Sequence, residues 1–551
     1  EDVSVELARA EDGWGEFPGS RGNGSEQADW QSVDIEQAAD SGTSLVFMLP
    51  DTPGSGLYKL RITRDGEESE PVLINAPEIW WMQGDSGEYS ASPGGWLRLV
   101  GHTIALADES RVVLSGAGKE ITLRSTEADT YAAEFDIPST LESGTYEVYT
   151  HNGSGAARGW QFSGEVKIAA ETEWKDEVFE VEERSGEAIQ AALDKAEANG
   201  GGVVYLPRGR YSMGHRMLEM PRRTTLRGEG RKMVTLKWDD MEDPPPALIR
   251  GQNSFAIEDL SIVSGNHQDG IQVHPSGDTD IDRGDVHIRR VYIRLDRFAP
   301  VTRRGVEESR KRYKERLWSD RDAAVRLGGE NVSLIDSKIT TPTGWENCIA
   351  IILDRVKGGV ISGNKTVASY RTGFMIHGSR NVIIEDNDFT GGLFMGMHYS
   401  DTQPRTRMNV FCSNIYFADN RVRYALMADW YLQFIGNEAY QAGNIGTRTY
   451  AYSDETGIGG FTGPISRGAI HRRNVHHTGR MFIHGGVDGG VVEDCISRGF
   501  DDGYVVDASH WKEGDEVADD ISRRSGVRMG AIGAARPKNI FLTGNKATED
   551  R

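Results

Sequence analysis

The segments Gly359-Val-Ile-Ser-Gly-Asn364 and Asn381-Val-Ile-Ile-Glu-Asp-Asn387 share one phrase: a turn residue, a few β-forming residues, and then Asn or Asp. Repetition of a short β phrase is the sequence signature of a solenoid. An Asn at the same turn of successive coils can stack its amide along the axis and satisfy backbone groups of the turn. The same phrase returns at Asn331-Val-Ser-Leu-Ile-Asp-Ser337, Asn414-Ile-Tyr-Phe-Ala-Asp-Asn420, Gly490-Val-Val-Glu-Asp494 and Asn539-Ile-Phe-Leu-Thr-Gly-Asn545.

A second phrase gives the length of one coil. It occurs as Asp322-Ala-Ala-Val-Arg-Leu327, Asn347-Cys-Ile-Ala-Ile351 and Thr372-Gly-Phe-Met-Ile-His377, whose first residues are evenly spaced along the chain. The spacing fits a three-strand coil, and neither a β-sandwich nor a β-propeller predicts stacked Asn turns. The repeats therefore predict a right-handed parallel β-helix, which also includes Asp269-Gly-Ile-Gln-Val-His274 and Asp502-Gly-Tyr-Val-Val-Asp507.

The predicted fold class is mainly β, with the parallel β-helix preceded by two small antiparallel β-sandwich domains. Short strands at regular spacing, bounded by Gly, Pro and Asp turns, favour sandwiches over residues 1–75 and 76–170. The β-helix is expected over 171–551. An apolar stripe at i, i+3, i+4 and i+7 predicts a capping helix over 187–199, which Gly200 would end.

The distribution of charge is uneven along the chain. The net charge is −22, and residues 1–180 hold 12 basic and 34 acidic side chains, whereas 181–551 hold 50 of each. The acidic first third would repel phosphate, so we expect no nucleic-acid partner.

The three cysteines are too few for a disulfide framework, and we expect buried free thiols. No apolar run is long enough to predict a membrane span, and no signal peptide is visible in this chain. A secreted, extracellular location is expected only because of the class of substrate inferred below.

Two segments carry a resemblance to known families. The helix, the glycines Asn199-Gly-Gly-Gly202 and the strand Val203-Val-Tyr-Leu206 resemble the first segment of pectate-lyase-like and family 28 glycoside-hydrolase-like β-helix proteins. The resemblance implies that the helix covers the open end of the solenoid, whose strand edges are otherwise unpaired. Gly95-Trp-Leu-Arg-Leu-Val-Gly101 with Gly144-Thr-Tyr-Glu-Val-Tyr-Thr-His-Asn152 resembles TIG-type immunoglobulin-like modules of secreted bacterial enzymes.

Asp269-Gly-Ile-Gln-Val273 resembles the Asn-Thr-Asp-Gly-Ile phrase of family 28 glycoside hydrolases, and Asp501-Asp-Gly-Tyr504 resembles their Asp-Asp-Cys-Ile-Ala. The resemblance implies a polysaccharide-degrading glycoside hydrolase, although the family's Gly-His-Gly and Arg-Ile-Lys phrases are absent. Hydrolysis uses two carboxyl groups across the scissile bond. Asp501 and Asp502 form the leading pair because adjacent carboxylates can share one proton.

Stacking predicts where the site lies. Alternation points Ile271 and Val273 inward and Gln272 outward, and coils stack about 4.8 Å apart, so residues distant in the chain share one flank. The expected catalytic residues are Asp501, Asp502, Asp269, Asp401, Glu455 and His377. Flat rings stack on pyranose faces and His or Arg can bind hydroxyls or carboxylates, so the expected substrate-binding residues are His274, His484, Trp430, Tyr431, Tyr452, Trp511 and Arg371.

Other readings of the sequence stay open. A polysaccharide lyase would use His or a basic residue as the base on a uronate, and a carbohydrate-binding or adhesive solenoid would need no chemistry. No cofactor is expected. Asp278, Asp280 and Asp282 alternate like the ligands of a structural Ca²⁺ loop, but the Gly and Glu of the EF-hand pattern are absent, so the sequence favours an acidic turn over a calcium site. The expected partner is a polysaccharide or oligosaccharide. Its sugar and linkage, and the oligomeric state of the chain, are not indicated.

Overall fold

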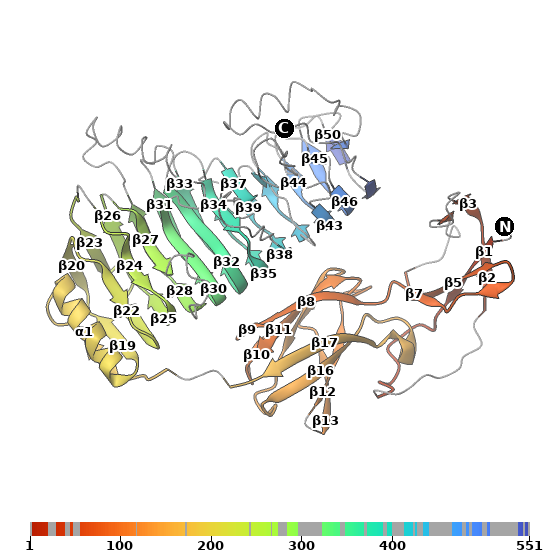
Figure 1. Ribbon diagram of the computed structural model, residues 1–551, viewed down its shortest axis with the longest axis horizontal. Helices are drawn as coiled ribbons and strands as arrows, with labels where there is room; N and C mark the ends of the chain where they lie inside the picture. Colours follow the sequence, from red (N-terminus) through yellow and green to blue (C-terminus); the bar gives the residue numbers. More distant parts are fainter. Residues whose placement is uncertain are drawn as a thin grey trace, which may run out of the picture. The chain divides into compact units, whose positions relative to one another are not determined.

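The chain forms two compact units, Glu1–Glu171 and Thr172–Arg551, in a computed structural model (Figure 1). Each unit is described by itself. The structure describes residues 3–19, 29–38, 45–47, 55–116, 118–170, 174–241, 244–265, 267–273, 284–295, 322–341, 348–368, 372–389, 394–398, 413–422, 425–426, 433–439, 466–476, 481–483, 487–498, 504–506, 538–543 and 546–548.

The first unit begins with a small antiparallel sheet. Its core contains Val5, Leu7, Val33, Tyr58 and Leu60, against which Ile35 and Phe47 of a separate two-stranded ribbon pack. The ribbon is β3 (Ile35–Ala38) with β4 (Leu45–Phe47). The sheet contains β1 (Val3–Arg9), β2 (Gln31–Val33), β5 (Tyr58–Arg64), β6 (Glu67–Glu68) and β7 (Val72–Ile74).

A β-sandwich of two five-stranded sheets follows. One sheet contains β8 (Glu78–Gly84), β9 (Gly87–Glu88), β11 (Trp96–His102), β14 (Glu127–Ala128) and β15 (Ala132–Asp136). The other contains β10 (Ser90–Ala91), β12 (Arg111–Gly116), β13 (Lys119–Arg124), β16 (Gly144–His151) and β17 (Gln161–Ile168), with the 3₁₀ helix η1 (Ala156–Gly159) between the last two. Apolar side chains of both sheets, such as Leu97, Phe135, Tyr146 and Val148, share one core.

Polar contacts join the small sheet to the sandwich within the first unit. Ser154 accepts a hydrogen bond at Oγ from the backbone N–H of Leu57 at 2.9 Å. Asn152 donates from Nδ2 to the carbonyl of Asn75 at 2.7 Å. Buried His151 lies 5.1 Å from the Trp14 ring, centroid to centroid. The two parts that the sequence separates at residue 75 therefore pack as one compact unit.

The second unit opens with helix α1 (Gly186–Asn199), where the sequence predicts the capping helix. Ser185 caps it by accepting a hydrogen bond from the N–H of Ala188, and Gly200 ends it at φ 81°, a left-handed conformation that glycine adopts without penalty. Its buried residues Ile189, Leu193 and Ala196 join the core of the β-helix, so the helix covers the first coil.

Strands of successive coils in the second unit stack in parallel on three faces, two of which belong to one continuous sheet, which confirms the predicted parallel β-helix (Figure 1). We call these faces the first, second and third sheets. The first sheet contains β21 (Leu218–Met220), β24 (Ala247–Gly251), β27 (Asp269–Val273), the first halves of β30 (Asp322–Ile335) and β32 (Cys348–Ser362), β34 (Thr372–His377), β37 (Phe394–His398) and β40 (Ala425–Leu426).

The second sheet shares β30 and β32, whose second halves continue into it. Its other strands are β18 (Val178–Glu180), β19 (Gly202–Leu206), β22 (Thr224–Gly228), β25 (Asn253–Glu258), β28 (Gly284–Arg289), β35 (Arg380–Glu385), β38 (Ser413–Ala418), β41 (Gln433–Ile435), β43 (Ser466–Arg472), β46 (Val487–Glu493) and β49 (Lys538–Thr543).

The third sheet contains β20 (Gly209–Gly214), β23 (Val234–Trp238), β26 (Ser261–Ser264), β29 (Tyr292–Leu295), β31 (Lys338–Thr341), β33 (Lys365–Ala368), β36 (Asp388–Phe389), β39 (Arg421–Val422), β42 (Glu438–Ala439), β44 (Val475–His476), β47 (Ile496–Arg498) and β50 (Lys546–Thr548). A separate parallel pair is formed by β45 (Met481–Ile483) and β48 (Tyr504–Val506).

The predicted Asn ladder is present at the turn between the second and third sheets. Asn364 donates from Nδ2 to Oδ1 of Asn387 at 3.0 Å, and Asn387 donates to Asn420 at 2.9 Å. Asn437 continues the ladder to Asn474 at 3.1 Å. The residue before each ladder position has a positive φ, for example 56° at Asp386 and 66° at Gly436, which bends the chain sharply into the third sheet.

Cys495 follows Asn474 in this column, and its thiol is buried, as expected, with the sulfur accepting a hydrogen bond from Nδ2 of Asn474 at 3.8 Å. Burial raises the pKa of the Cys495 thiol to about 11, so the thiol is uncharged near neutral pH. The side chains of Cys348 and Cys412 lie outside the described residues.

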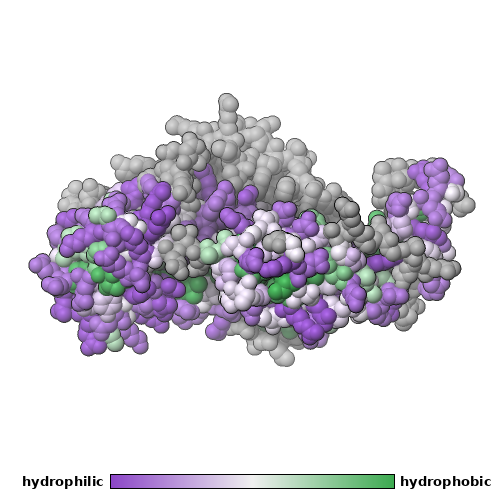
Figure 2. Space-filling view, turned by 90° about the horizontal axis from the view of Figure 1, so that it is seen from below, coloured by the Kyte–Doolittle hydropathy of each residue, from purple (hydrophilic) through white to green (hydrophobic). Residues whose placement is uncertain are grey.

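Hydrophilic residues cover most of the described surface on the face that Figure 2 shows. The exposed large hydrophobic residues of the described chain are few and scattered over several elements: Val72, Leu73, Phe162, Val178 and Met233. No helix in the described ranges is long and apolar enough to span a bilayer.

Candidate functional site

The first sheet contains the two predicted catalytic residues that fall within described strands. Asp269 begins β27 and His377 ends β34, and both strands belong to this sheet. The other predicted catalytic and binding residues, and the possible calcium ligands, lie outside the described residues: Asp401, Glu455, Asp501, Asp502, His274, His484, Trp430, Tyr431, Tyr452, Trp511, Arg371, Asp278, Asp280 and Asp282.

Asp269 lies in a buried ion pair with Arg326 of β30. Nε of Arg326 donates to Oδ2 of Asp269 at 2.7 Å, and Nη2 donates to Oδ1 at 3.3 Å. The side chains of Asp269 and Arg326 are only 5% and 8% exposed. Nε2 of Gln272 and the backbone N–H of Ala323 each add a hydrogen bond of 2.7 Å to this carboxylate. Four donors thus hold Asp269 in place, and charge-assisted bonds of this kind are among the stronger ones.

The guanidinium of Arg326 interacts with several carboxylates of this face. Burial disfavours the charged guanidinium, but the attraction of Asp269 and, further, of Asp354 and Asp322 outweighs it, so the pKa of Arg326 is raised. The guanidinium of Arg326 therefore stays charged near neutral pH. Within the described part of the chain, Oε1 of Gln272 is buried beside this pair without a hydrogen-bond donor.

An apolar strip continues the same outer face along the axis. Register places Gln272 beside Arg326, Arg326 beside Ile352, and Ile352 beside Met375. Ile352 and Met375 form a separate buried cluster with Ala323 and Ile349, apart from the solenoid core. Charges next to a buried apolar cluster interact more strongly with one another than charges in water do.

Three polar residues occupy one register position at the end of the first sheet. Asp354 of β32 pairs with His377 of β34, and His377 pairs with His398 of β37. Neighbouring parallel strands lie about 4.8 Å apart, so the three backbone positions form a row along the axis. Asp354 is half-buried, and its charge acts on Arg326. The row therefore places an aspartate next to two histidines in strand register, and histidine is a residue type that exchanges protons near neutral pH.

The constant period that the sequence predicts is wrong in detail. The structure pairs Asp322 with Cys348 rather than with Asn347, and Ile351 with Phe374 rather than with Ile376. Asp322 also does not share the position of Asp269, because Ile271 pairs with Val325 and Asp269 corresponds to Ala323. The period varies because each coil keeps its strands and turns in register while the connecting segments differ in length.

Sequence reasoning did not single out Arg326, Asp354 or His398. Arg326 stood inside a repeated phrase, and Asp354 directly follows the apolar run Ile349-Ala-Ile-Ile-Leu353. The sequence does contain a signal for Asp354, because a charged residue directly after a buried strand is a common position for a binding or catalytic residue. The assumed constant period placed Ile352, rather than Asp354, beside His377.

No cluster of three or more His, Cys, Asp or Glu side chains that could hold a metal occurs among the residues for which the structure is described. The described charged side chains of this face include Asp354 and the Asp269–Arg326 pair, and strand register places the backbone positions of His377 and His398 in the row of Asp354.

Comparison with known proteins gives distant structural likenesses. No family model matches the chain, and no curated protein matches it. The A-module of a mannuronan C-5 epimerase from Azotobacter vinelandii is 15% identical, with 66% of this chain and 94% of that chain covered and a TM-score of 0.42. A family 28 exopolygalacturonase from Yersinia enterocolitica is 11% identical, with 86% and 99% covered and a TM-score of 0.38.

A DFA-IIIase from Arthrobacter chlorophenolicus is 10% identical, with 60% of this chain and 92% of that chain covered and a TM-score of 0.33. These three neighbours are carbohydrate-active β-helix enzymes. At such identities and TM-scores the likeness says nothing of a reaction or a substrate for this chain.

Proposed function

We propose that the protein is a polysaccharide-degrading enzyme that works on the outer face of the first sheet of its β-helix. The observation that supports this most is the row of Asp354, His377 and His398 beside the buried Asp269–Arg326 pair. Perturbed, buried charge next to proton-exchanging residues is typical of catalytic sites.

The reaction that we propose is glycosidic hydrolysis by an acid and a base. Asp354 and His377 are the proposed proton-transfer groups, because they are neighbours in the row and the imidazole can carry a proton near neutral pH. Asp269 and Arg326 are proposed as positioning residues, since four hydrogen bonds already occupy the carboxylate of Asp269. The pair Asp501 and Asp502 stays a proposal for the remaining carboxyl group.

A second candidate is β-elimination on a uronate, which two neighbouring histidines favour. A histidine base can remove the proton next to a uronate carboxyl group. The two reactions differ in product: elimination leaves an unsaturated sugar that absorbs ultraviolet light, and hydrolysis does not.

A panel of neutral and acidic polysaccharides, read by reducing-end release and by ultraviolet absorbance together, tests both candidates. Release without absorbance supports hydrolysis, and release with absorbance supports elimination. Tight binding without any release from any polysaccharide would contradict both and favour a carbohydrate-binding solenoid.

We also propose an extracellular location, since intact polysaccharides are met outside the cell. Fractionation of the producing cells tests it: activity in the medium or on the cell surface supports the proposal, and activity confined to the cell contents contradicts it.

A further inference from the structure

A groove outside the proposed site lies on the third sheet of the β-helix, where that sheet meets the turn before it. It encloses 710 Å³ and is lined by Arg231, Lys232, Asp259, Arg290, Tyr292, Asp336, Ser337, Lys338, Gly363 and Lys365. We call it the cationic groove, because five of these side chains are cations and two are carboxylates. This is a local excess of positive charge, because residues 181–551 as a whole hold 50 basic and 50 acidic side chains.

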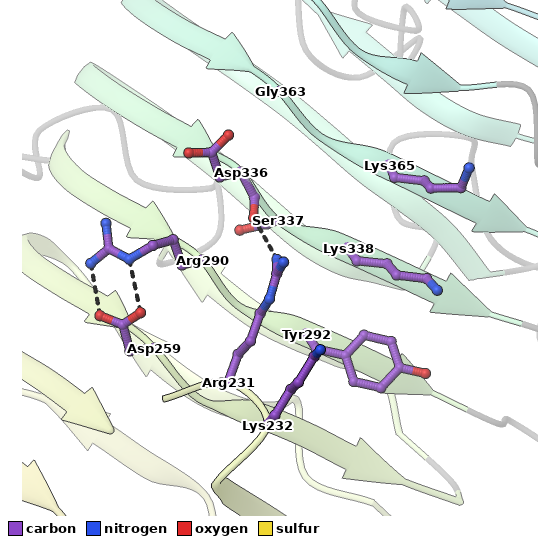
Figure 3. Close-up of a pocket in the computed structure, with 10 residues that line it drawn as sticks. All are labelled: Arg231, Lys232, Asp259, Arg290, Tyr292, Asp336, Ser337, Lys338, Gly363 and Lys365. Atoms are coloured by element: carbon purple, nitrogen blue, oxygen red, sulfur yellow. Dashed lines mark hydrogen bonds and ion pairs between the residues drawn. The ribbon is translucent and has the colours of Figure 1, made fainter. Parts of the chain in front are cut away.

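The floor of the groove is one row of side chains on three neighbouring strands. Tyr292 of β29 pairs in register with Lys338 of β31, and Lys338 pairs with Lys365 of β33. Figure 3 shows the three side chains projecting to the same side. Adjacent parallel strands lie about 4.8 Å apart, so the aromatic ring of Tyr292 and the ammonium groups of Lys338 and Lys365 follow one another at regular spacing along the floor.

The wall of the groove is the turn that leads into β23. Arg231 reaches along the axis and donates from Nη1 to the carbonyl of Asp336 at 3.0 Å, across 105 residues of sequence (Figure 3). Lys232, the next residue of the same turn, also lines the groove. Both residues are exposed, so their charges face the solvent-filled groove.

One of the two carboxylates that line the groove is paired with an arginine. Asp259 forms a bidentate pair with Arg290, with contacts of 2.8 and 2.7 Å. Lys365 is paired with Asp388 at 2.6 Å. By contrast, no carboxylate of the described ranges lies within ion-pair distance of Arg231, Lys232 or Lys338. The Lys338 ammonium lies 5.7 Å from the Tyr292 ring centroid.

We propose that the cationic groove binds a stretch of an acidic polysaccharide. Arg231, Lys232 and Lys338 would take its carboxylate or sulfate groups, and Tyr292 would stack on one sugar ring. A linear glycan fits because its charges repeat along one line, as the floor does. A nucleic-acid groove would offer several rings for successive bases, whereas this floor offers one. The groove is separate from the row of Asp354, and binding there does not depend on the proposed reaction.

Affinity electrophoresis of the full chain through gels that contain a glycan tests the proposal. Polygalacturonate supplies carboxylates, dextran sulfate supplies sulfates, and neutral dextran supplies neither. We expect retardation by at least one acidic glycan, weaker at high salt because exposed charges are screened, and none by neutral dextran. No retardation in either acidic gel, or equal retardation in neutral dextran, would overturn the proposal.

The decisive variant is Lys232→Gln with Lys338→Gln, because neither ammonium makes an ion pair that the fold needs. The apparent affinity for the acidic glycan should fall about tenfold, and Arg231→Gln should lower it further. The matched control, Lys195→Gln with Lys357→Gln, removes the same charge from α1 and from the second sheet and should change nothing.

Equal losses in both double variants would show that net charge alone decides binding, against the proposal. Single-stranded DNA that competes as well as the glycan would also contradict it. Far-ultraviolet circular dichroism and the Tm check that each variant is folded, and Lys338→Gln alone serves if the double variant is not.

Discussion

Asp269 and Arg326, 57 residues apart in the chain, form a bidentate ion pair of 2.7 and 3.3 Å on the outer face of the first sheet. Their burial makes the pair sensitive to loss of either partner. Arg326→Met leaves Asp269 buried without its cationic partner, and we expect it to lower the free energy of unfolding by about 3–5 kcal/mol.

A double-mutant cycle measures that coupling by urea unfolding. Asp269→Leu with Arg326→Met should cost clearly less than the sum of the two single changes, because it leaves no charge unpaired. Additive costs would mean that the two side chains do not stabilise one another.

Catalysis gives the second prediction. If Asp354 and His377 transfer protons, Asp354→Asn and His377→Gln should each lower kcat by about 10²–10⁴-fold on whichever polysaccharide the protein degrades. Glu330→Gln, an exposed residue paired with Lys357, is the matched control and should keep full activity. Full activity in both site variants would remove the row from the mechanism.

The Asn ladder gives the third prediction. Asn420 donates from Nδ2 to the carbonyls of Ile384 and Ala418, both at 2.8 Å, and accepts from the backbone and side chain of Asn387. Asn420→Ala would leave these buried groups unpaired, and we expect a loss of about 3 kcal/mol in urea unfolding. Lys357→Ala, an exposed change, should stay within about 0.5 kcal/mol.

The left-handed turn gives the fourth prediction. Gly436 has φ 66°, and a Cβ there would lie 2.2 Å from Oδ1 of Asp419 in the neighbouring coil. Gly436→Ala should therefore cost about 1–2 kcal/mol. Asp419→Gly removes the steric clash but leaves the unfavourable φ at position 436, so Gly436→Ala should cost less in the Asp419→Gly variant than in the parent. Thermal unfolding of all four proteins checks this, and an equal cost in both backgrounds would place the whole cost in the backbone.

His151 of the first unit gives the fifth prediction, on pH. Burial, with a further contribution from Arg111, lowers its pKa from 6.5 to about 4. Between pH 6.5 and 4 the unfolded chain therefore binds a proton that the folded chain does not, and stability falls as the pH falls. Over this window the loss attributable to His151 is about 3 kcal/mol.

His151→Gln should lack this component of the pH dependence. Near-ultraviolet circular dichroism follows unfolding of the first unit, because Trp14 and Trp160 pack on His151. Parallel pH profiles of the variant and the parent would show that His151 does not cause the acid sensitivity.

The repeats of the sequence determined the architecture, because each repeated residue answers a local requirement that every coil shares. Asn364, Asn387 and Asn420 satisfy the same turn in successive coils, and the stripe of Ile189 and Leu193 marks a helix that must bury one face. Patterns of this kind can be recognised in one chain alone.

Only the tertiary structure decided which residues lie side by side in successive coils. The ion pair of Asp269 with Arg326 and the strand pairings of Asp354 with His377 and of Lys338 with Tyr292 all depend on register. Register is the sum of unequal connections, so a coil that is longer or shorter than its neighbour shifts every later contact. The sequence alone does not determine the register, because the number of residues in a connecting segment does not say at which residue the next strand begins.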